Sequence, residues 1–275
     1  MTEQHRPDPS DTSALYVFAV CRGVDPATVA GLPGMAPDEP VRTLPFGTLT
    51  AVVQTVRAAD YTEEAWQARL ADRPELERCA RAHHEVVSAA AASCPTVPLP
   101  LATLYHSEER ARQALTGETQ RFRAVLRRTA GHAEWGVKVY AAAAPRADAP
   151  RAAAPQAEPG STAGRARPGP GAGLAYLDRK RGIQARREQL QEAALRIADT
   201  VDAEFQNLAA AARRLRVHGP ELAGERRVQV LNATYLVARE RADSLVPLTR
   251  TLRDTTGADI ELSGPWVAYS FVGEV

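Results

Sequence analysis

A cysteine and two histidines lie on one short stretch of the sequence in a spacing that could bind a metal. Cys79 and His83 are four residues apart, which places them on one face of a helix, and His84 follows directly. A closed structural zinc site needs four ligands, and an open catalytic site usually has three. The stretch falls short of both unless the fold brings Cys21 or Cys94 to it. We therefore expect no metal here, and we interpret the stretch as a helix with one buried thiol and a solvated histidine pair.

The other residue patterns that carry enzymatic chemistry are missing from the sequence. No serine lies on a nucleophile elbow, and no cysteine has a catalytic motif around it. The stretches 31–34 and 169–171 contain glycine but lack the lysine and the helix start of a phosphate-binding loop. Asp259 and Glu261 share a strand face without a neighbouring histidine, which favours solvent-facing alternation over an acid/base pair. The sequence predicts a protein that is not an enzyme and that has no cofactor.

The composition argues against several classes of partner. Lysine and arginine number 34 against 33 acidic residues, so the net charge of +1 gives no global attraction to nucleic acid or to anionic membranes. The consensus of RNA-binding strands is absent, and no apolar run approaches the ~20 residues of a membrane span. The three cysteines lack the spacing of a disulfide framework, and the chain start lacks the apolar core of a signal peptide. We expect a cytoplasmic protein with no nucleic-acid or membrane partner.

Residues 144–172 separate two regions of more usual composition. They hold six prolines, four glycines and ten alanines, but no leucine, isoleucine, valine or aromatic residue. Such a segment cannot bury enough apolar surface to offset the entropy of ordering it. We interpret it as a disordered linker between an N-terminal domain, 1–143 with a disordered start at 1–13, and a C-terminal domain, 173–275.

The N-terminal region has the pattern of an α+β domain with an antiparallel or mixed sheet and helices on one face. Pro74 suits the first turn of a helix, Ser107 suits an N-cap, and Gly117 suits a helix end. The expected elements are strands at 15–20 and 41–56 (two, meeting near Gly47), a helix from Arg73 to before Cys94, an edge strand or an ordered rim at 96–103, helices after Ser107 and at 118–129, and a closing strand at 133–142.

The C-terminal region begins with a long helical pattern and continues as a ferredoxin-like α+β layer. Pro247 should kink the second helix or mark its late start, and Gly257 should end it. The expected elements are a helix at 174–212, strands at 215–218 and 228–237, a helix at 239–255, and two final strands, ADIELS (258–263) and PWVAYSFV (265–272).

The closing string, Ser263 to Phe271, resembles the signature of the GvpF/GvpL family of gas vesicle accessory proteins. Other blocks of the sequence also resemble the family and occur in the family's order across both regions, which makes the resemblance specific. These blocks are the opening strand 15–20, VVSAAAASCPTVPLPLATLYHSEE (86–109), EWGVKVY (134–140), Gly173 to Leu177, and Asn232 to Val237. Residues 101–104 depart from the family pattern, where an arginine and a phenylalanine are common.

The resemblance implies a non-enzymatic role in building gas vesicles. A family member is expected to be an assembly factor or minor structural component that associates with the vesicle and contacts the main shell protein, of the GvpA type, and other accessory proteins. The alternative is a small-molecule-binding regulatory module with two ferredoxin-like halves.

The last strand carries our candidate site residues. In PWVAYSFV, alternation places Tyr269 and Phe271 on one face, which we expect to pack in the core together with Tyr235 of the matching block. Trp266 lies at the strand entrance after Gly264 and Pro265. We divide its role evenly between a ring that locks the fold and a contact for a partner, with Gly264 and Pro265 as the other partner-contact candidates.

Overall fold

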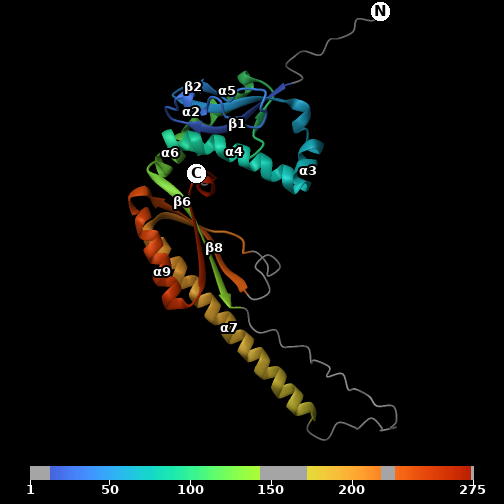
Figure 1. Cartoon of the computed structure of the whole chain (residues 1–275), viewed down its shortest axis with the longest axis vertical. Helices are drawn as coiled ribbons and strands as arrows, with labels where there is room; N and C mark the ends of the chain where they lie inside the picture. Colours follow the sequence, from blue (N-terminus) through green and yellow to red (C-terminus); the bar gives the residue numbers. More distant parts are fainter. Residues whose placement is uncertain (1–12, 143–171, 218–226, 274–275) are drawn as a thin grey trace, which may run out of the picture.

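The computed structural model describes residues 13–142, 172–217 and 227–273. They form two lobes, each built on an antiparallel sheet with helices, which confirms the α+β class (Figure 1). The expected linker, 144–172, lies outside the described residues except for its last residue, and so does the start of the chain before Ser13. Within the described residues, no helix is both long and apolar enough to cross a membrane.

The first sheet is antiparallel in every described pairing, which is one of the two arrangements expected. Its order is β2-β3-β1-β4, with β5 paired to β1, so the proline-rich β4 lies at an edge as predicted. The strands are β1 (Ser13–Cys21), β2 (Arg42–Phe46), β3 (Leu49–Arg57), β4 (Thr96–Pro98) and β5 (Leu104–Tyr105).

Helices cover the first sheet on both faces, not on one face as expected. One face packs on α4 (Arg73–Ser93) around Phe18, and the other packs on α5 (Glu108–Gly117) and α6 (Thr119–Thr129) around Val17. The unbroken apolar run of β1 is the physical reason, because a strand buried on both faces has no polar side to alternate with.

Local sequence signals set the ends of these helices. Helix α4 covers the predicted residues, with Pro74 in its first turn. The Arg110 amide donates to the Ser107 hydroxyl at 3.2 Å, which confirms the N-cap of α5, and α5 ends at Gly117. The remaining helices of this lobe are α2 (Pro26–Val29), η1 (Ala58–Tyr61) and α3 (Glu63–Ala71).

The second sheet contains a strand that was expected in the first. Strand β6 (His132–Ala142) pairs with β8 (Arg227–Ala238) on one side and with β9 (Asp259–Trp266) on the other, and β7 (Ala209–Arg214) completes the order β7-β8-β6-β9. The prediction that 133–142 closes the first domain is wrong. Its alternation indicated a half-covered strand but could not indicate which sheet accepts it, because that depends on partners distant in sequence.

With β6 as its first strand, the second lobe has a complete ferredoxin-like topology. The chain order is β6, α7 (Ala172–Leu208), β7, β8, α9 (Leu245–Thr256) and β9. This confirms the predicted fold of the C-terminal half. Residues 143–171 therefore connect the first strand of one layer to its first helix, and the chain passes between the lobes at the short step from α6 to β6.

Two element boundaries in this lobe are informative. The long helix was expected to reach residue 212, but it ends at Leu208 and the alanine-rich β7 follows directly, because pairing with β8 overrides the helix propensity of alanine. Pro247 is the third residue of α9, which follows the 3₁₀ turn η2 (Arg239–Ser244), so the predicted late start is correct. Gly257, with φ of +67°, ends α9 as predicted.

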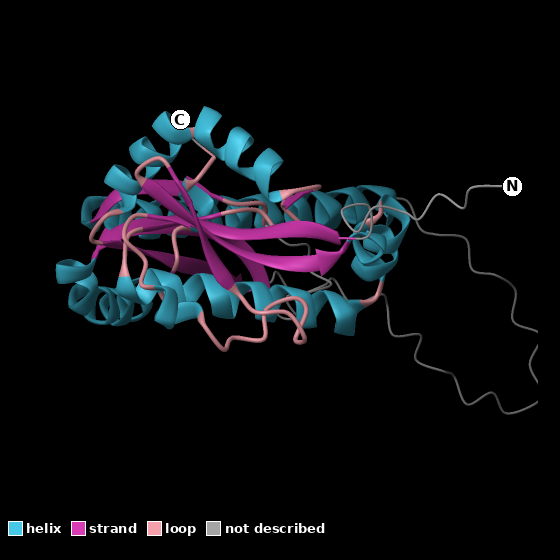
Figure 2. Cartoon of the chain, turned by 90° about the horizontal axis from the view of Figure 1, so that it is seen from above, coloured by secondary structure: helices cyan, strands magenta, loops and turns pink. Residues whose placement is uncertain are grey.

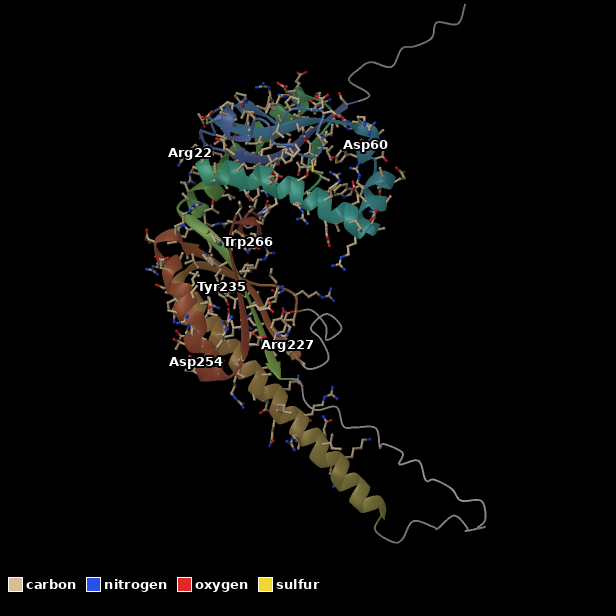
Figure 3. The ribbon with its side chains drawn as sticks, viewed as in Figure 1. Arg22, Asp60, Arg227, Tyr235, Asp254 and Trp266 are labelled. Carbon is tan, nitrogen blue, oxygen red and sulfur yellow. The ribbon has the colours of Figure 1, made fainter. Side chains whose placement is uncertain are left out.

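The core of the second lobe lies between its sheet and helices α7 and α9, and Figure 3 shows Tyr235 within it. The Tyr235 hydroxyl donates to the buried Asp202 carboxylate at 2.6 Å, and Arg214 and Gln206 donate to the other oxygen. Burial raises the pKa of Asp202, but the hydrogen bonds from Tyr235, Arg214 and Gln206 outweigh burial and lower it. Seen from above, in the view of Figure 2, the strands of the molecule lie between its helices.

The chain end departs from the predicted pair of strands. ADIELS and the start of PWVAYSFV form one strand, β9, which ends at Trp266, and Tyr269–Phe271 form the 3₁₀ turn η3. The predicted alternation of Tyr269 and Phe271 on one strand face is therefore wrong. Pro265 has no N–H to donate, and the pairing of β9 with β6 is already irregular between Gly136 and Glu134. The hydrogen-bonded ladder between these two strands therefore ends at Trp266.

Candidate functional site at the junction of the lobes

The chain end, Gly264–Gly273, lies between the two lobes and contacts both; we call it the C-terminal segment (Figure 1). Val267 packs against the α4 side of the first sheet, and Val272 packs against its α5 and α6 side. Phe271 packs with Leu236, on the face of the second sheet opposite to α7. The C-terminal segment thus covers one face of the second sheet and also contacts the first lobe on both sides of its sheet.

Gly264 is required where the segment leaves β9. Its φ is +134°, which side-chain-bearing residues rarely adopt. A Cβ at this position would lie 2.9 Å from the Glu134 carbonyl oxygen and 3.0 Å from the Trp135 ring. Both neighbours belong to the central strand β6, so the backbone approaches that strand too closely for any residue but glycine.

A buried carboxylate holds the turn that follows. Glu134 on β6 is buried, and its carboxylate accepts hydrogen bonds from the Ser270 amide at 2.8 Å and from the Ser270 hydroxyl at 2.5 Å. Charge-assisted bonds of this kind are stronger than neutral ones, and a buried carboxylate depends on them. Strand alternation alone would place Glu134 on the exposed face of β6. The C-terminal segment covers that face.

Two arginines bind the carbonyls of the same turn from different lobes. Arg213 of β7 donates to the Ser270 carbonyl at 2.9 Å, and Arg128 of α6 donates to the Phe271 carbonyl. The last peptide groups of η3 are therefore held by the first lobe and the second lobe at once. None of Glu134, Arg128 and Arg213 stands out in the sequence, because nothing local distinguishes them from other charged residues.

The two rings of η3 have different environments. Phe271 is 1% exposed in a small cluster with Leu236 and Ala268. Tyr269 remains 37% exposed, so its expected place in the core is wrong. Its ring contacts His83 and His84 of α4 at centroid distances of 6.5 and 5.9 Å, and its hydroxyl lies 3.3 Å from His84 Nδ1. Burial of this hydroxyl, with the nearby Glu134 charge, raises the pKa of Tyr269.

Trp266 is the most exposed aromatic side chain of the junction. It is 47% exposed and meets the His84 ring edge-on at 5.7 Å. Figure 3 shows it where the second lobe faces α4. An indole that rests on one ring and keeps half of its surface in water has apolar area left for another contact.

A cavity of about 660 Å³ lies beside this indole. Its wall comes from the end of α4, from the α6 to β6 connection and from the C-terminal segment. The polar side chains at the wall include His84, His132 and Arg239, and the rings include Trp135 and Trp266. A volume of this size is within the range of ligand pockets.

The helix stretch that carries Cys79, His83 and His84 differs in one respect from its expected form. His83 is buried, its Nδ1 lies 2.9 Å from the Tyr16 hydroxyl, and burial lowers the pKa of His83 to about 4. Cys79 lies 3.7 Å from a Glu75 oxygen. The described residues contain no group of three or more His, Cys, Asp or Glu side chains placed to hold a metal. Only one of the two histidines, His84, is partly exposed, so the expected solvated pair is wrong.

The acid pair on β9 faces solvent, as expected. Asp259 forms an ion pair with Arg227 of β8, and Glu261 accepts a hydrogen bond from Tyr140 of β6 at 3.4 Å. Arg227 also lies over the Tyr140 ring at 5.4 Å. These contacts tie adjacent strands together on the exposed face, and among the described residues the partners of the two acids are an arginine and a tyrosine.

The model of the gas vesicle synthesis protein GvpL/GvpF family matches residues 14–273. The chain belongs to the GvpL/GvpF family. It is 37% identical over 259 residues to gas vesicle protein L of Streptomyces sp. (strain CB03234), covering 94% of this chain and 92% of that protein.

Two solved structures share the GvpL/GvpF-family fold seen here. The crystal structure of GvpF from Anabaena sp. PCC7120 matches with a TM-score of 0.65 and 15% identity, covering 96% of this chain and 98% of that one. GvpF from Microcystis aeruginosa matches with a TM-score of 0.62 and 14% identity, covering 95% and 99%. Both matches include both lobes, so the two-lobed arrangement belongs to the family fold.

Proposed function

We propose that this GvpL/GvpF-family chain is a non-enzymatic assembly factor or minor structural component of gas vesicles. It works in the cytoplasm on the vesicle, where it contacts the main shell protein and other accessory proteins. The family match over 14–273 carries this proposal, because it spans both lobes and the C-terminal segment. The site agrees with it, since Glu134, Arg213 and Arg128 at the junction all hydrogen-bond to the C-terminal segment and hold its backbone in place.

Trp266, with Pro265 and Gly264 before it, is our candidate for a partner contact. The indole is anchored by His84 on one side and open on the other. Aromatic side chains that combine a fixed position with open apolar surface are typical of interface hot spots. Gly264 and Pro265 fix the path of the chain into this ring, so they support the contact rather than make it.

Deletion of the gene in a vesicle-forming host tests the function. We expect few or malformed vesicles by electron microscopy, restored by the wild-type gene on a plasmid. Normal vesicle number and shape in the deletion strain would overturn an assembly role. A pull-down with the purified main shell protein then separates a direct contact from an indirect one.

The cavity favours a second candidate function, the binding of a small-molecule regulator. Its volume and its two tryptophans suit a small ligand. The expected form of this alternative needs two ferredoxin-like halves, however, and only the second sheet has that topology. A metabolite panel screened by thermal melting tests it. A ligand that raises the melting temperature, with the effect lost in Trp135→Ala, would favour this candidate.

A further inference from the structure

Two of the three cysteines lie near one another in the first lobe, and the proposed partner contact at Trp266 uses neither of them. Cys21 is the last residue of β1, and Cys94 is the residue that caps the end of α4. Strand β1 pairs with β4 so that Cys21 lies opposite Thr96. The Thr96 hydroxyl is 3.4 Å from Cys21 Sγ and 3.7 Å from Cys94 Sγ, so both thiols lie beside the same hydroxyl group.

The backbones that carry these thiols are also tied together. The Arg22 amide donates to the Pro95 carbonyl at 3.1 Å, so the residues that follow each cysteine are in direct contact. A disulfide forms only where two chains already run close enough for their Cβ atoms to approach. The pairing of β1 with β4, together with the Thr96 hydroxyl that lies beside both thiols, brings the two cysteines to one place within the first lobe.

Access to the two sulfurs is unequal. Cys21 is fully buried on the α4 side of the first sheet, whereas Cys94 is partly exposed and forms part of the wall of the junction cavity. A small solute that enters the cavity reaches Cys94 first and meets Cys21 only behind it. A reactive thiol in an open position, with a second thiol buried next to it, is the arrangement of an oxidisable cysteine and its resolving partner.

The electrostatics of the pair support the same division. The neighbouring Cys21 thiol, opposed by partial burial and assisted by Thr96, Ser93 and the Arg22 backbone, lowers the pKa of Cys94. The neighbouring Cys94 and burial raise the pKa of Cys21. These directions favour the thiolate, which is the form that attacks oxidants, at Cys94 and the protonated thiol at Cys21.

We propose that Cys94 and Cys21 form a peroxide-reactive thiol pair, in which Cys94 reacts with a small hydroperoxide from the junction cavity and Cys21 then closes a disulfide with it. The Cys94 thiolate attacks one peroxide oxygen, the O–O bond breaks, and the leaving alkoxide or hydroxide takes a proton. Cys94 becomes a sulfenic acid. The Cys21 sulfur then attacks the Cys94 sulfur, the S–O bond breaks and water leaves. The two thiols lose two electrons, and the hydroperoxide is reduced to an alcohol and water.

The third cysteine provides an internal reference. Cys79 is buried on α4, and burial raises the pKa of its thiol. It lies next to Glu75 and Arg78, with no second cysteine among its hydrogen-bond partners. The folded protein is therefore expected to oxidise at two of its three cysteines only, and the identity of those two is fixed by the fold.

The test uses the reduced full-length protein and hydrogen peroxide at equimolar amounts, followed by thiol titration and peptide mass spectrometry. We expect loss of two thiols per chain, a cross-linked peptide pair containing Cys21 and Cys94, and recovery of all thiols with dithiothreitol. Cys79→Ser should behave as wild type. Cys94→Ser should block oxidation of Cys21, and Cys21→Ser should stop at a Cys94 sulfenic acid that a cyclic 1,3-dione traps.

A measurement on the unaltered protein keeps the result independent of how the variants fold. At pH 7, iodoacetamide should label Cys94 about tenfold faster than a cysteine in an unstructured peptide, and this advantage should vanish in denaturing urea. Labelling of Cys94 at the peptide rate, or peroxide oxidation that yields no bond between Cys21 and Cys94, would overturn the proposal. Oxidation of Cys79 as fast as Cys94 would overturn it as well.

Discussion

The two sheets of this protein are completed in different ways. The first sheet takes its strands from 13–105, and helices from nearby in the chain cover both of its faces. The second sheet takes its central strand from before residues 143–171 and the rest from after them, and one of its faces is covered by the C-terminal segment. A composition break in the sequence therefore does not mark a break in the fold. It lies inside the second layer, while the lobes meet at the unremarkable step from α6 to β6.

The most severe test of this comparison divides the chain at the composition break. A fragment 172–275 lacks the central strand β6, which pairs with both β8 and β9, so we expect it to show no cooperative melting. Coexpressed 1–142 and 172–275 should assemble and copurify, because β6 then completes the sheet. Circular dichroism and gel filtration measure both outcomes. Independent folding of 172–275 would mean that β6 is dispensable, and the domain boundary expected from the sequence would be restored.

The two rings of η3 provide the next largest contrast. Phe271→Ala removes a buried ring between the lobes and should lower the free energy of unfolding by roughly 3–5 kcal/mol. Tyr269→Ala removes a ring that is 37% exposed and should cost less than about 2 kcal/mol. Urea denaturation of both variants measures the difference. Equal losses would show that Tyr269 is as much a core residue as its neighbour.

Acid should weaken the first lobe before the second. The pKa of His83 is about 4 when folded against 6.5 for the free side chain, so the unfolded chain binds the extra proton between these values. The contribution of neutral His83 to the free energy of unfolding is complete above pH 6.5. It falls by up to about 3 kcal/mol as the pH drops toward 4. Asp202 in the second lobe has a lowered pKa, so its contribution persists above the ordinary carboxyl range and is lost only below it.

Hydrogen exchange at pH 7 and pH 5 locates this effect. Peptides of β1 and α4 should lose protection at pH 5, while peptides of β8 should keep it. The control is His83→Gln, which lacks the titrating ring; its stability at pH 7 should be lower than that of wild type, and its dependence on pH between 6.5 and 4 should be flatter. The same slope in His83→Gln as in wild type would assign the acid sensitivity to another group.

The sequence predicted the local structure well and the long-range structure poorly. Caps and breakers such as Ser107, Pro247 and Gly257 placed helix ends correctly, because their effects act over a few residues. The sheet that receives β6, and the turn at Tyr269, depend on contacts between distant residues. Glu134 shows why such contacts escape detection: alternation places it outside, and only the returning chain end, 136 residues later, buries it.

The candidate site shows the same division. Gly264, Pro265 and Trp266 were singled out from their string, and the structure places them at the junction of the lobes. The groups that hold the junction, Arg128 and Arg213, were missed because an arginine that binds a backbone carbonyl has no sequence signature.

The smallest expected effect on stability belongs to Trp266, and it decides what the C-terminal segment is for. Trp266→Ala leaves Phe271 and the Glu134 bonds to Ser270 in place, so the free energy of unfolding should fall by less than about 1 kcal/mol. If the open face of the indole meets a partner, binding to the main shell protein or to another accessory protein should weaken by ~2 kcal/mol or more. Val246→Ala, at an exposed apolar site on α9, is the control and should change neither quantity. A stability loss as large as that of Phe271→Ala, with unchanged binding, would instead make Trp266 a ring that locks the lobes together. The search for the docking surface would then move to the exposed part of α7, where Ile183 and Leu190 face solvent.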